Sequence, residues 1–176
     1  ELPYRPCVGI MVLNKAGLVW SGRRIPIGNS EYDGSPQLWQ MPQGGIDPGE
    51  DAETAAVREL FEETGVTADK IELIARAPRE LTYDLPEDMI GKVWKGKWRG
   101  QRQTWFLYRF LGQDGDIRIE TERPEFRAWR WIEPASLPAM IVPFKKALYE
   151  ELLVVFADHF AAAGGDAAIP AGGQSA

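Results

Sequence analysis

The chain contains few of the residues that build disulfide frameworks and zinc sites. It has one cysteine, Cys7, and one histidine, His159, among 176 residues. A single cysteine excludes an internal disulfide and is typical of a protein from a reducing compartment. Because zinc is usually held by several nitrogen or sulfur ligands, the same scarcity argues against a zinc site. We expect Cys7 to be a packed thiol and His159 a surface residue, and neither to be catalytic.

Long hydrophobic runs are also missing. No stretch approaches the roughly 20 apolar residues that a membrane-spanning helix needs, and no charged-then-apolar leader opens the chain. We therefore expect a cytoplasmic protein without a membrane partner. Nothing in the sequence indicates an obligate protein partner.

Positive charge is in deficit, with a formal net charge of −6. This balance argues against non-specific nucleic-acid binding by the whole surface. One stretch, residues 92–102, is by contrast basic and aromatic. Its cations are Lys92, Lys95, Lys97, Arg99 and Arg102, and Trp94, Trp98 and Trp105 lie among or just beyond them. The stretch could steer a polyanion, or it could be a solvated loop.

The length suits one domain with a substantial core. Apolar and alternating segments predict strands at residues 8–13, 18–21, 38–41, 71–75, 80–85, 104–110 and 126–132. Helices are expected at 52–64, with Asp51 as N-cap and Gly65 as C-terminal glycine, and at 143–163. The apolar side of the first helix would comprise Ala56, Val57, Leu60 and Phe61, and the apolar stripe of the second would comprise Phe144, Ala147, Leu148, Leu152, Val155 and Phe156. Residues 25–36 and 86–101 are expected to be loops, and Pro42 to Gly45 to interrupt a strand. We therefore predict an α/β domain over residues 1–163, a mixed β-sheet sandwiched between helices, followed by a flexible Gly/Ala-rich tail at 164–176.

The predicted helix at 52–64 carries an unusual group of acids. Glu59, Glu62 and Glu63 stand at positions i, i+3 and i+4, so they share one face. Like charges at this spacing cost roughly 0.2–0.5 kcal/mol per pair, which favours a cation among them. Carboxylate oxygens are ligands that Mg²⁺ prefers, and Mg²⁺ also binds phosphate oxygens. The alternative is an ordinary acidic surface helix.

The run from Gly44 to Val66 has the pattern G-x5-E-x7-R-E-U-x-E-E-x-G-U, where U is a bulky apolar residue. It therefore resembles the Nudix box, whose family has an αβα sandwich fold and hydrolyses phosphoanhydrides with Mg²⁺, or alternatively Mn²⁺. The resemblance implies that the Gly44 carbonyl is a metal ligand and that Arg58 pairs with Glu50. On a regular helix, Arg58 should point away from the acidic face. Glu59 is the favoured general base, with a role as metal ligand alone as the alternative.

Further strings resemble one branch of that family, the bacterial RNA pyrophosphohydrolases and the asymmetric dinucleoside tetraphosphate hydrolases. They are Tyr4-Arg5-Pro6, Trp39-Gln40-Met41-Pro42-Gln43-Gly44-Gly45, Gly100-Gln101-Arg102-Gln103-Thr104-Trp105-Phe106, Pro124-Glu125-Phe126, Trp129-Arg130-Trp131 and Phe144-Lys145. Residues 25–37 look longer than the equivalent turn of the shortest RNA-processing members, and their length is closer to the dinucleotide hydrolases.

The resemblance also implies roles for individual residues. Glu125 would complete the metal site from across the box. The phosphate and nucleotide pocket would be lined by Arg5, Arg24, Gln101 and Lys145. Tyr83 and Phe144 would stack on a base. The alternatives are ordinary surface charges for the first group and core packing for the aromatic pair.

These features predict an Mg²⁺-dependent pyrophosphohydrolase acting on a nucleotide polyphosphate or an RNA 5′ end. The favoured reaction removes pyrophosphate from the 5′-triphosphate end of RNA, and the alternative splits a dinucleoside tetraphosphate into ATP and AMP. A third hypothesis is a Nudix-fold module that senses a nucleotide without hydrolysing it. Such modules commonly lose acids from the box, whereas Glu50, Glu59, Glu62 and Glu63 are all present here.

Overall fold

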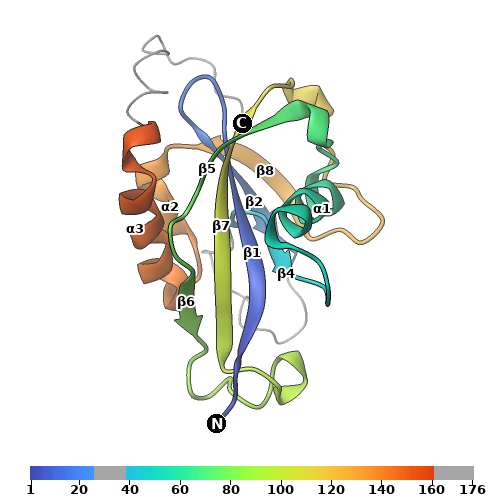
Figure 1. The fold of residues 1–176 in the computed structure, drawn as a ribbon. Helices are drawn as coiled ribbons and strands as arrows, with labels where there is room; N and C mark the ends of the chain where they lie inside the picture. The colour runs from blue at the N-terminus through green and yellow to red at the C-terminus, as the bar shows by residue number, and fades with distance from the viewer. Residues whose placement is uncertain (26–38, 161–176) are drawn as a thin grey trace.

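A mixed β-sheet lies between α1 on one side and α2 with α3 on the other (Figure 1). The computed structural model describes residues 1–25 and 39–160. The strands are β1 (Tyr4–Leu13), β2 (Val19–Arg24), β3 (Trp39–Gln40), β4 (Gln43–Gly45), β5 (Ile71–Arg76), β6 (Leu81–Asp84), β7 (Gly100–Phe110) and β8 (Phe126–Ile132). The helices are α1 (Ala52–Thr64), α2 (Leu137–Met140) and α3 (Lys146–Val155). The predicted αβα class is confirmed.

The centre of the sheet is the parallel pair β1 and β7. The strand order is β3-β2-β1-β7-β5, while β4 pairs with β1, β6 with β7 and β8 with β2. Side chains of β1 alternate between two cores, so that Val8 and Ile10 face α1 while Met11 and Leu13 face the α3 side. Burial on both faces explains why this strand reads as a continuous apolar run.

Helix α1 begins and ends where its sequence predicts. The Asp51 side chain accepts a hydrogen bond from the Thr54 N–H at 2.9 Å, and Gly65 ends the helix with φ of 73°. Leu60 is buried as expected, but Phe61 is 52% exposed. The expectation that Phe61 belongs to the buried side was wrong, because it lies one position further round the helix, at the rim of a cleft.

Residues 42–45 do not simply interrupt the chain as predicted. Gln43–Gly45 form β4, which pairs antiparallel with β1 and places Cys7 opposite Gly45 and Val8 opposite Gly44. Pairing with the long central strand overrides the low strand propensity of the glycines. This short strand carries Gly44 to the side of α1.

The C-terminal helix is shorter than predicted. Pro143–Lys145 form a 3₁₀ turn, and α3 is interrupted at Phe156, which lies outside helical geometry with φ of −104° and ψ of 16°. Helix α2 was not predicted. The buried stripe of α3 includes Leu148 and Leu152 as expected, whereas Ala147 is exposed.

Most of residues 25–36 and all of 164–176 lie outside the described residues, so the loop, the domain boundary at 163 and the tail stay predictions. Residues 86–99 form a loop as expected, with a 3₁₀ turn at Trp94–Gly96, whereas Gly100 and Gln101, which were predicted to belong to the loop, begin β7.

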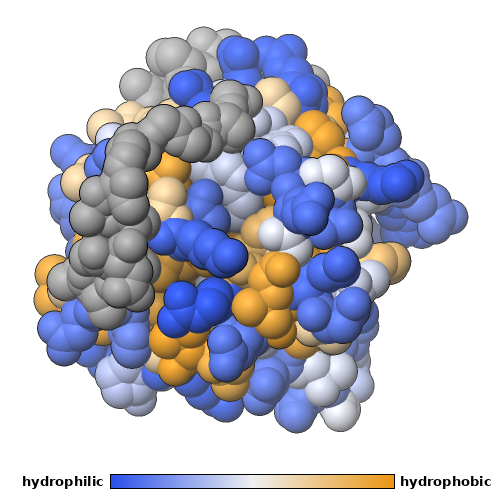
Figure 2. Space-filling model, turned by 90° about the horizontal axis from the view of Figure 1, so that it is seen from above, coloured by the Kyte–Doolittle hydropathy of each residue, from blue (hydrophilic) through white to orange (hydrophobic). Residues whose placement is uncertain are grey.

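The surface is mostly hydrophilic on the face seen from above, with hydrophobic side chains in smaller groups between (Figure 2). Within the described ranges, no helix has both the length and the apolar character that crossing a membrane would require.

Candidate active site

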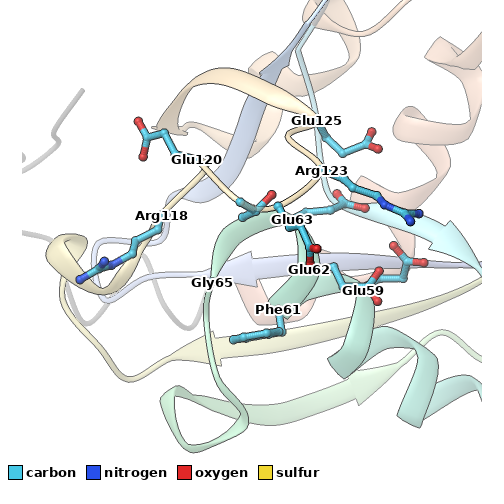
Figure 3. Close-up of a pocket in the computed structure, with 11 residues that line it drawn as sticks. Glu59, Phe61, Glu62, Glu63, Gly65, Arg118, Glu120, Arg123 and Glu125 are labelled. Atoms are coloured by element: carbon cyan, nitrogen blue, oxygen red, sulfur yellow. The ribbon is translucent and has the colours of Figure 1, made fainter.

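Three acids of α1, Glu59, Glu62 and Glu63, line a cleft of about 670 Å³. Glu63 is 5% exposed and the Glu59 side chain 14%, whereas the Glu62 side chain is 54% exposed. Glu125 lies on the segment just before β8, across the cleft from these glutamates (Figure 3). The three box glutamates therefore differ in environment, since two are sheltered and one faces solvent.

A second cleft of about 280 Å³ opens beside the first and shares Glu59, Glu63 and Glu125 with it. Its remaining lining residues are Arg5, Arg24, Gln43, Gly44, Gly45, Trp94 and Gln101. Residues predicted to bind a substrate's phosphates thus meet residues predicted to hold a metal ion. The two groups come from β1, β2, β4, β7, α1 and the segment just before β8, which are far apart in sequence.

Arg58 is the centre of the ionic network. Its Nε and Nη2 donate to the two oxygens of Glu50 at 2.8 and 2.9 Å, and Nη2 also donates to the Gly45 carbonyl at 2.9 Å. The predicted pairing with Glu50 is confirmed, and this bidentate contact fixes the loop before α1 to the helix. It also holds the pKa of Glu50 down at about 2.

Arg58 does not point away from the acidic face, so that expectation was wrong. Its Nη1 donates to Glu59 at 3.0 Å and to Glu62 at 3.3 Å. The arginine side chain is long enough to bend over the helix surface, where the carboxylates of Glu50, Glu59 and Glu62 attract its guanidinium.

The buried carboxylates repel one another. Burial raises the pKa of Glu63 well above its ordinary value, and the neighbouring Glu59 and Glu125 carboxylates raise it further. Burial also raises the pKa of Glu59, although hydrogen bonding with Glu63 and Arg58 opposes that rise. A cation placed between these groups would relieve both desolvation and repulsion.

The donor set fits a hard divalent cation. Carboxylates and a backbone carbonyl are the oxygen ligands that Mg²⁺ takes. In residues 1–25 and 39–160, however, no three Asp, Glu, His or Cys side chains already converge tightly enough to hold an ion. Arg58 instead pairs with Glu59 and Glu62, and the Glu59 side chain also hydrogen-bonds with that of Glu63.

Gly44 lies directly against the Glu59 carboxylate. A Cβ at this position would be 2.0 Å from the Glu59 Cδ, and a Cβ on Gly45 would be 2.6 Å from the Arg5 Nη2. Both glycines therefore allow charged groups to approach the β4 backbone closely. The side chain that approaches Gly44 is that of Glu59, the favoured general base.

Three predicted substrate residues, Tyr83, Phe144 and Lys145, do not line either cleft. Tyr83 is 6% exposed and Lys145 is 2% exposed. The Tyr83 ring packs 5.8 Å from that of Phe144 and 5.1 Å from the Lys145 Nζ. This placement favours core packing for Tyr83, and the stacking and binding roles of all three stay predictions.

Gln43 and Trp94 line the smaller cleft but were not singled out as site residues from the sequence. Gln43 belongs to the string Trp39-Gln40-Met41-Pro42-Gln43, which could have drawn attention to it. Trp94 was noted only as part of the basic and aromatic stretch. Its φ of 53° is rare for a residue with a side chain, and the residue lines the smaller cleft.

Cys7 should react very slowly with thiol reagents. It is fully buried, and burial raises the pKa of its thiol to about 11, so little reactive thiolate exists near pH 8. We expect an aromatic disulfide reagent to label the folded protein at least roughly a hundredfold more slowly than the denatured chain. Rapid labelling of the folded protein would contradict this packing.

Comparisons with known proteins agree with this geometry. An RNA pyrophosphohydrolase of Rhizobium meliloti is 57% identical over 160 residues, covering 89% of this chain and 95% of its own. One from Cereibacter sphaeroides is 53% identical and covers 91% and 94%. A Caenorhabditis elegans Ap4A hydrolase structure shares the fold, with a TM-score of 0.63, 21% identity and coverage of 90% and 98%.

The family comparison covers most of the chain. The profile described as the NUDIX domain matches residues 3–152, which include both clefts and every described element up to α3. Nudix hydrolases generally use divalent metal ions, in agreement with the oxygen donors found here. The chain belongs to the Nudix family.

Proposed function

We propose that this protein is an Mg²⁺-dependent pyrophosphohydrolase that removes pyrophosphate from the 5′-triphosphate end of RNA. The observation that carries the proposal is the smaller cleft, where Arg5, Arg24 and Gln101 face the same space as Glu59, Glu63 and Glu125. A triphosphate needs cationic and N–H donors for its outer oxygens and a divalent ion at the reacting phosphate. The relatives named RNA pyrophosphohydrolase support the choice of substrate.

Each group of site residues has a chemical task in this proposal. Glu59, Glu62, Glu63, Glu125 and the Gly44 carbonyl would hold Mg²⁺. When bound, Mg²⁺ neutralises charge on the phosphates and makes a water easier to deprotonate. Arg5 and Arg24 bind phosphate oxygens, and Glu59 accepts the proton of the attacking water. Arg58 and Glu50 hold the loop and helix in place.

Trp94 lies at the smaller cleft together with the arginines. An indole there offers a flat surface for a base adjoining the phosphates, which is a sequence-tolerant contact. Through Trp94, the basic and aromatic stretch would take a direct part in binding RNA. The placement supports an RNA end over a free inorganic polyphosphate.

The substrate assignment is tested by a parallel assay in Mg²⁺ with identified products. We expect triphosphorylated RNA to give monophosphorylated RNA and pyrophosphate, at a kcat/KM above those for dinucleoside tetraphosphate and free nucleoside triphosphates. If the enzyme instead preferred dinucleoside tetraphosphate and converted it to ATP and AMP, the alternative substrate would be the correct one. A preference for free triphosphates would reject both.

Mg²⁺ should stabilise the fold through the same carboxylates. At a concentration 100-fold above its Kd, a ligand of the folded state contributes about 2.7 kcal/mol, which is roughly 5–10 °C in Tm for a chain of this size. Thermal unfolding with and without Mg²⁺, at ionic strength matched with NaCl, measures the effect. Glu63→Gln should lose most of the shift, and an equal shift in that variant would place the ion elsewhere.

A further inference from the structure

A chain of three glutamine side chains connects a buried indole to the smaller cleft. Gln101, Gln103 and Trp105 alternate along β7 and share one face of the strand. The Trp105 Nε1 donates to the Gln103 Oε1 at 2.7 Å. The Gln103 Nε2 then donates to the Gln101 Oε1 at 2.8 Å and to the Gln43 Oε1 at 3.0 Å.

The indole determines the orientation of all three amides. An indole N–H can only donate, so the atom it contacts on Gln103 must be the oxygen. The other end of that amide is then an NH₂ group with donors alone, and its two partners must be the oxygens of Gln43 and Gln101. The ambiguity that usually attends amide orientation is thereby removed.

The consequence appears at the cleft. Gln43 and Gln101 both line it, and with their oxygens turned toward Gln103 they are left with NH₂ groups for the cleft side. Within the described residues, neither NH₂ group donates a hydrogen bond to the protein. Phosphate oxygens only accept hydrogen bonds, so this orientation suits a phosphate, whereas carbonyl oxygens in the same place would repel it.

The packing around the Trp105 indole holds it in one position. Trp105 and Gln103 are both 0% exposed. The indole crosses Gly9 on β1, where a Cβ would lie 2.2 Å from the Trp105 Cε2. Gly9 thus lets the ring lie flat against the sheet.

We propose that Trp105 and Gln103 are positioning residues that hold the Gln43 and Gln101 NH₂ groups toward the phosphates of the substrate. This inference rests on the proposed function for its substrate class, a polyphosphate end, and it adds Gln43 as a phosphate-binding residue. Neither positioning residue contacts the substrate, because each acts through the two outer glutamines.

The test compares Trp105→Phe with a matched control. Trp105→Phe keeps an aromatic ring but removes the N–H, which lets the Gln103 amide turn over. Trp20 is also buried at 2% exposed, and its Nε1 has no hydrogen-bond partner among the described residues, so Trp20→Phe makes the same truncation without affecting the amides. We expect Trp105→Phe to raise KM for triphosphorylated RNA roughly tenfold with kcat within about twofold, and Trp20→Phe to leave KM unchanged.

Gln103→Glu is a second variant, and it should reverse the direction of the hydrogen bonds to Gln43 and Gln101. A carboxylate accepts from Trp105 but cannot donate to Gln43 or Gln101, so both outer amides should turn their oxygens to the cleft. The same rise in KM is expected. If this variant does not fold, Trp105→Phe still decides the matter, because a KM no higher than that of Trp20→Phe would overturn the proposal.

A readout independent of turnover separates this inference from the proposed function. Titration of the wild-type protein with Mg²⁺ and inorganic tripolyphosphate should shift the side-chain NH₂ resonances of Gln43 and Gln101 in a ¹⁵N-edited NMR spectrum. Trp105→Phe should weaken that binding roughly tenfold. Binding with these shifts but no hydrolysis of RNA ends would sink the proposed function alone, whereas unmoved NH₂ resonances would sink the positioning role.

Discussion

Replacing Glu63 with Gln is expected to lower kcat for triphosphorylated RNA by roughly a thousandfold or more, equivalent to about 4 kcal/mol of transition-state stabilisation. Glu63 is buried between Glu59 and Glu125, where its charge counts most for holding a divalent ion. The amide keeps the shape of the side chain but supplies no negative charge. Arg5 and Arg24 are untouched, so the Kd for the RNA end should change little.

The control for this variant is Glu53→Gln, which removes an exposed carboxylate from the first turn of the same helix. It should retain wild-type turnover. Single-turnover assays and equilibrium binding separate the two effects in Glu63→Gln. Wild-type turnover in that variant would show that the buried carboxylate does not hold the reacting ion.

Gly44→Ala should damage activity far more than stability. The added methyl would overlap the Glu59 carboxyl group, with a Cβ to Cδ distance of 2.0 Å. The Glu59 side chain can move aside, so the free energy of unfolding should fall by only about 1 kcal/mol. The displaced carboxylate can no longer act in place, and a misplacement of about 1 Å can cost roughly a hundredfold in rate.

Gly115→Ala provides the comparison, because a Cβ at Gly115 would meet nothing within 4 Å. Steady-state kinetics and denaturant unfolding should be measured on both variants. A Gly44→Ala enzyme with wild-type activity would mean that catalysis does not depend on the observed position of the Glu59 carboxylate. A Gly44→Ala protein that unfolds would instead assign the glycine a role in folding.

The local features of α1 were predictable from sequence because each is a short-range effect. Asp51 caps one end and Gly65 the other, and the glutamate spacing alone places the acids on one face. The extent of β4 was not predictable in this way. Its strand geometry depends on pairing with β1, a contact that glycine-rich composition does not reveal.

The site was only partly predictable for a similar reason. Residue types and family resemblance indicated Arg5, Arg24, Gln101 and Glu125, which the structure places around one cleft. The bend of Arg58 toward Glu59 and Glu62 depends on a side-chain conformation that helix spacing cannot determine. The burial of Tyr83 depends on how β6 packs against the 3₁₀ turn that begins at Pro143.

The central claim is that the α1 carboxylates hold the divalent ion at which a polyphosphate is cut. A crystal of the protein soaked in Mn²⁺ tests it most directly, because anomalous scattering locates the ion without reference to activity. The account predicts a peak in contact with the carboxylates of Glu59 and Glu63, and its loss in Glu63→Gln. A fully occupied Mn²⁺ site elsewhere, with no anomalous density beside these two side chains, would contradict it.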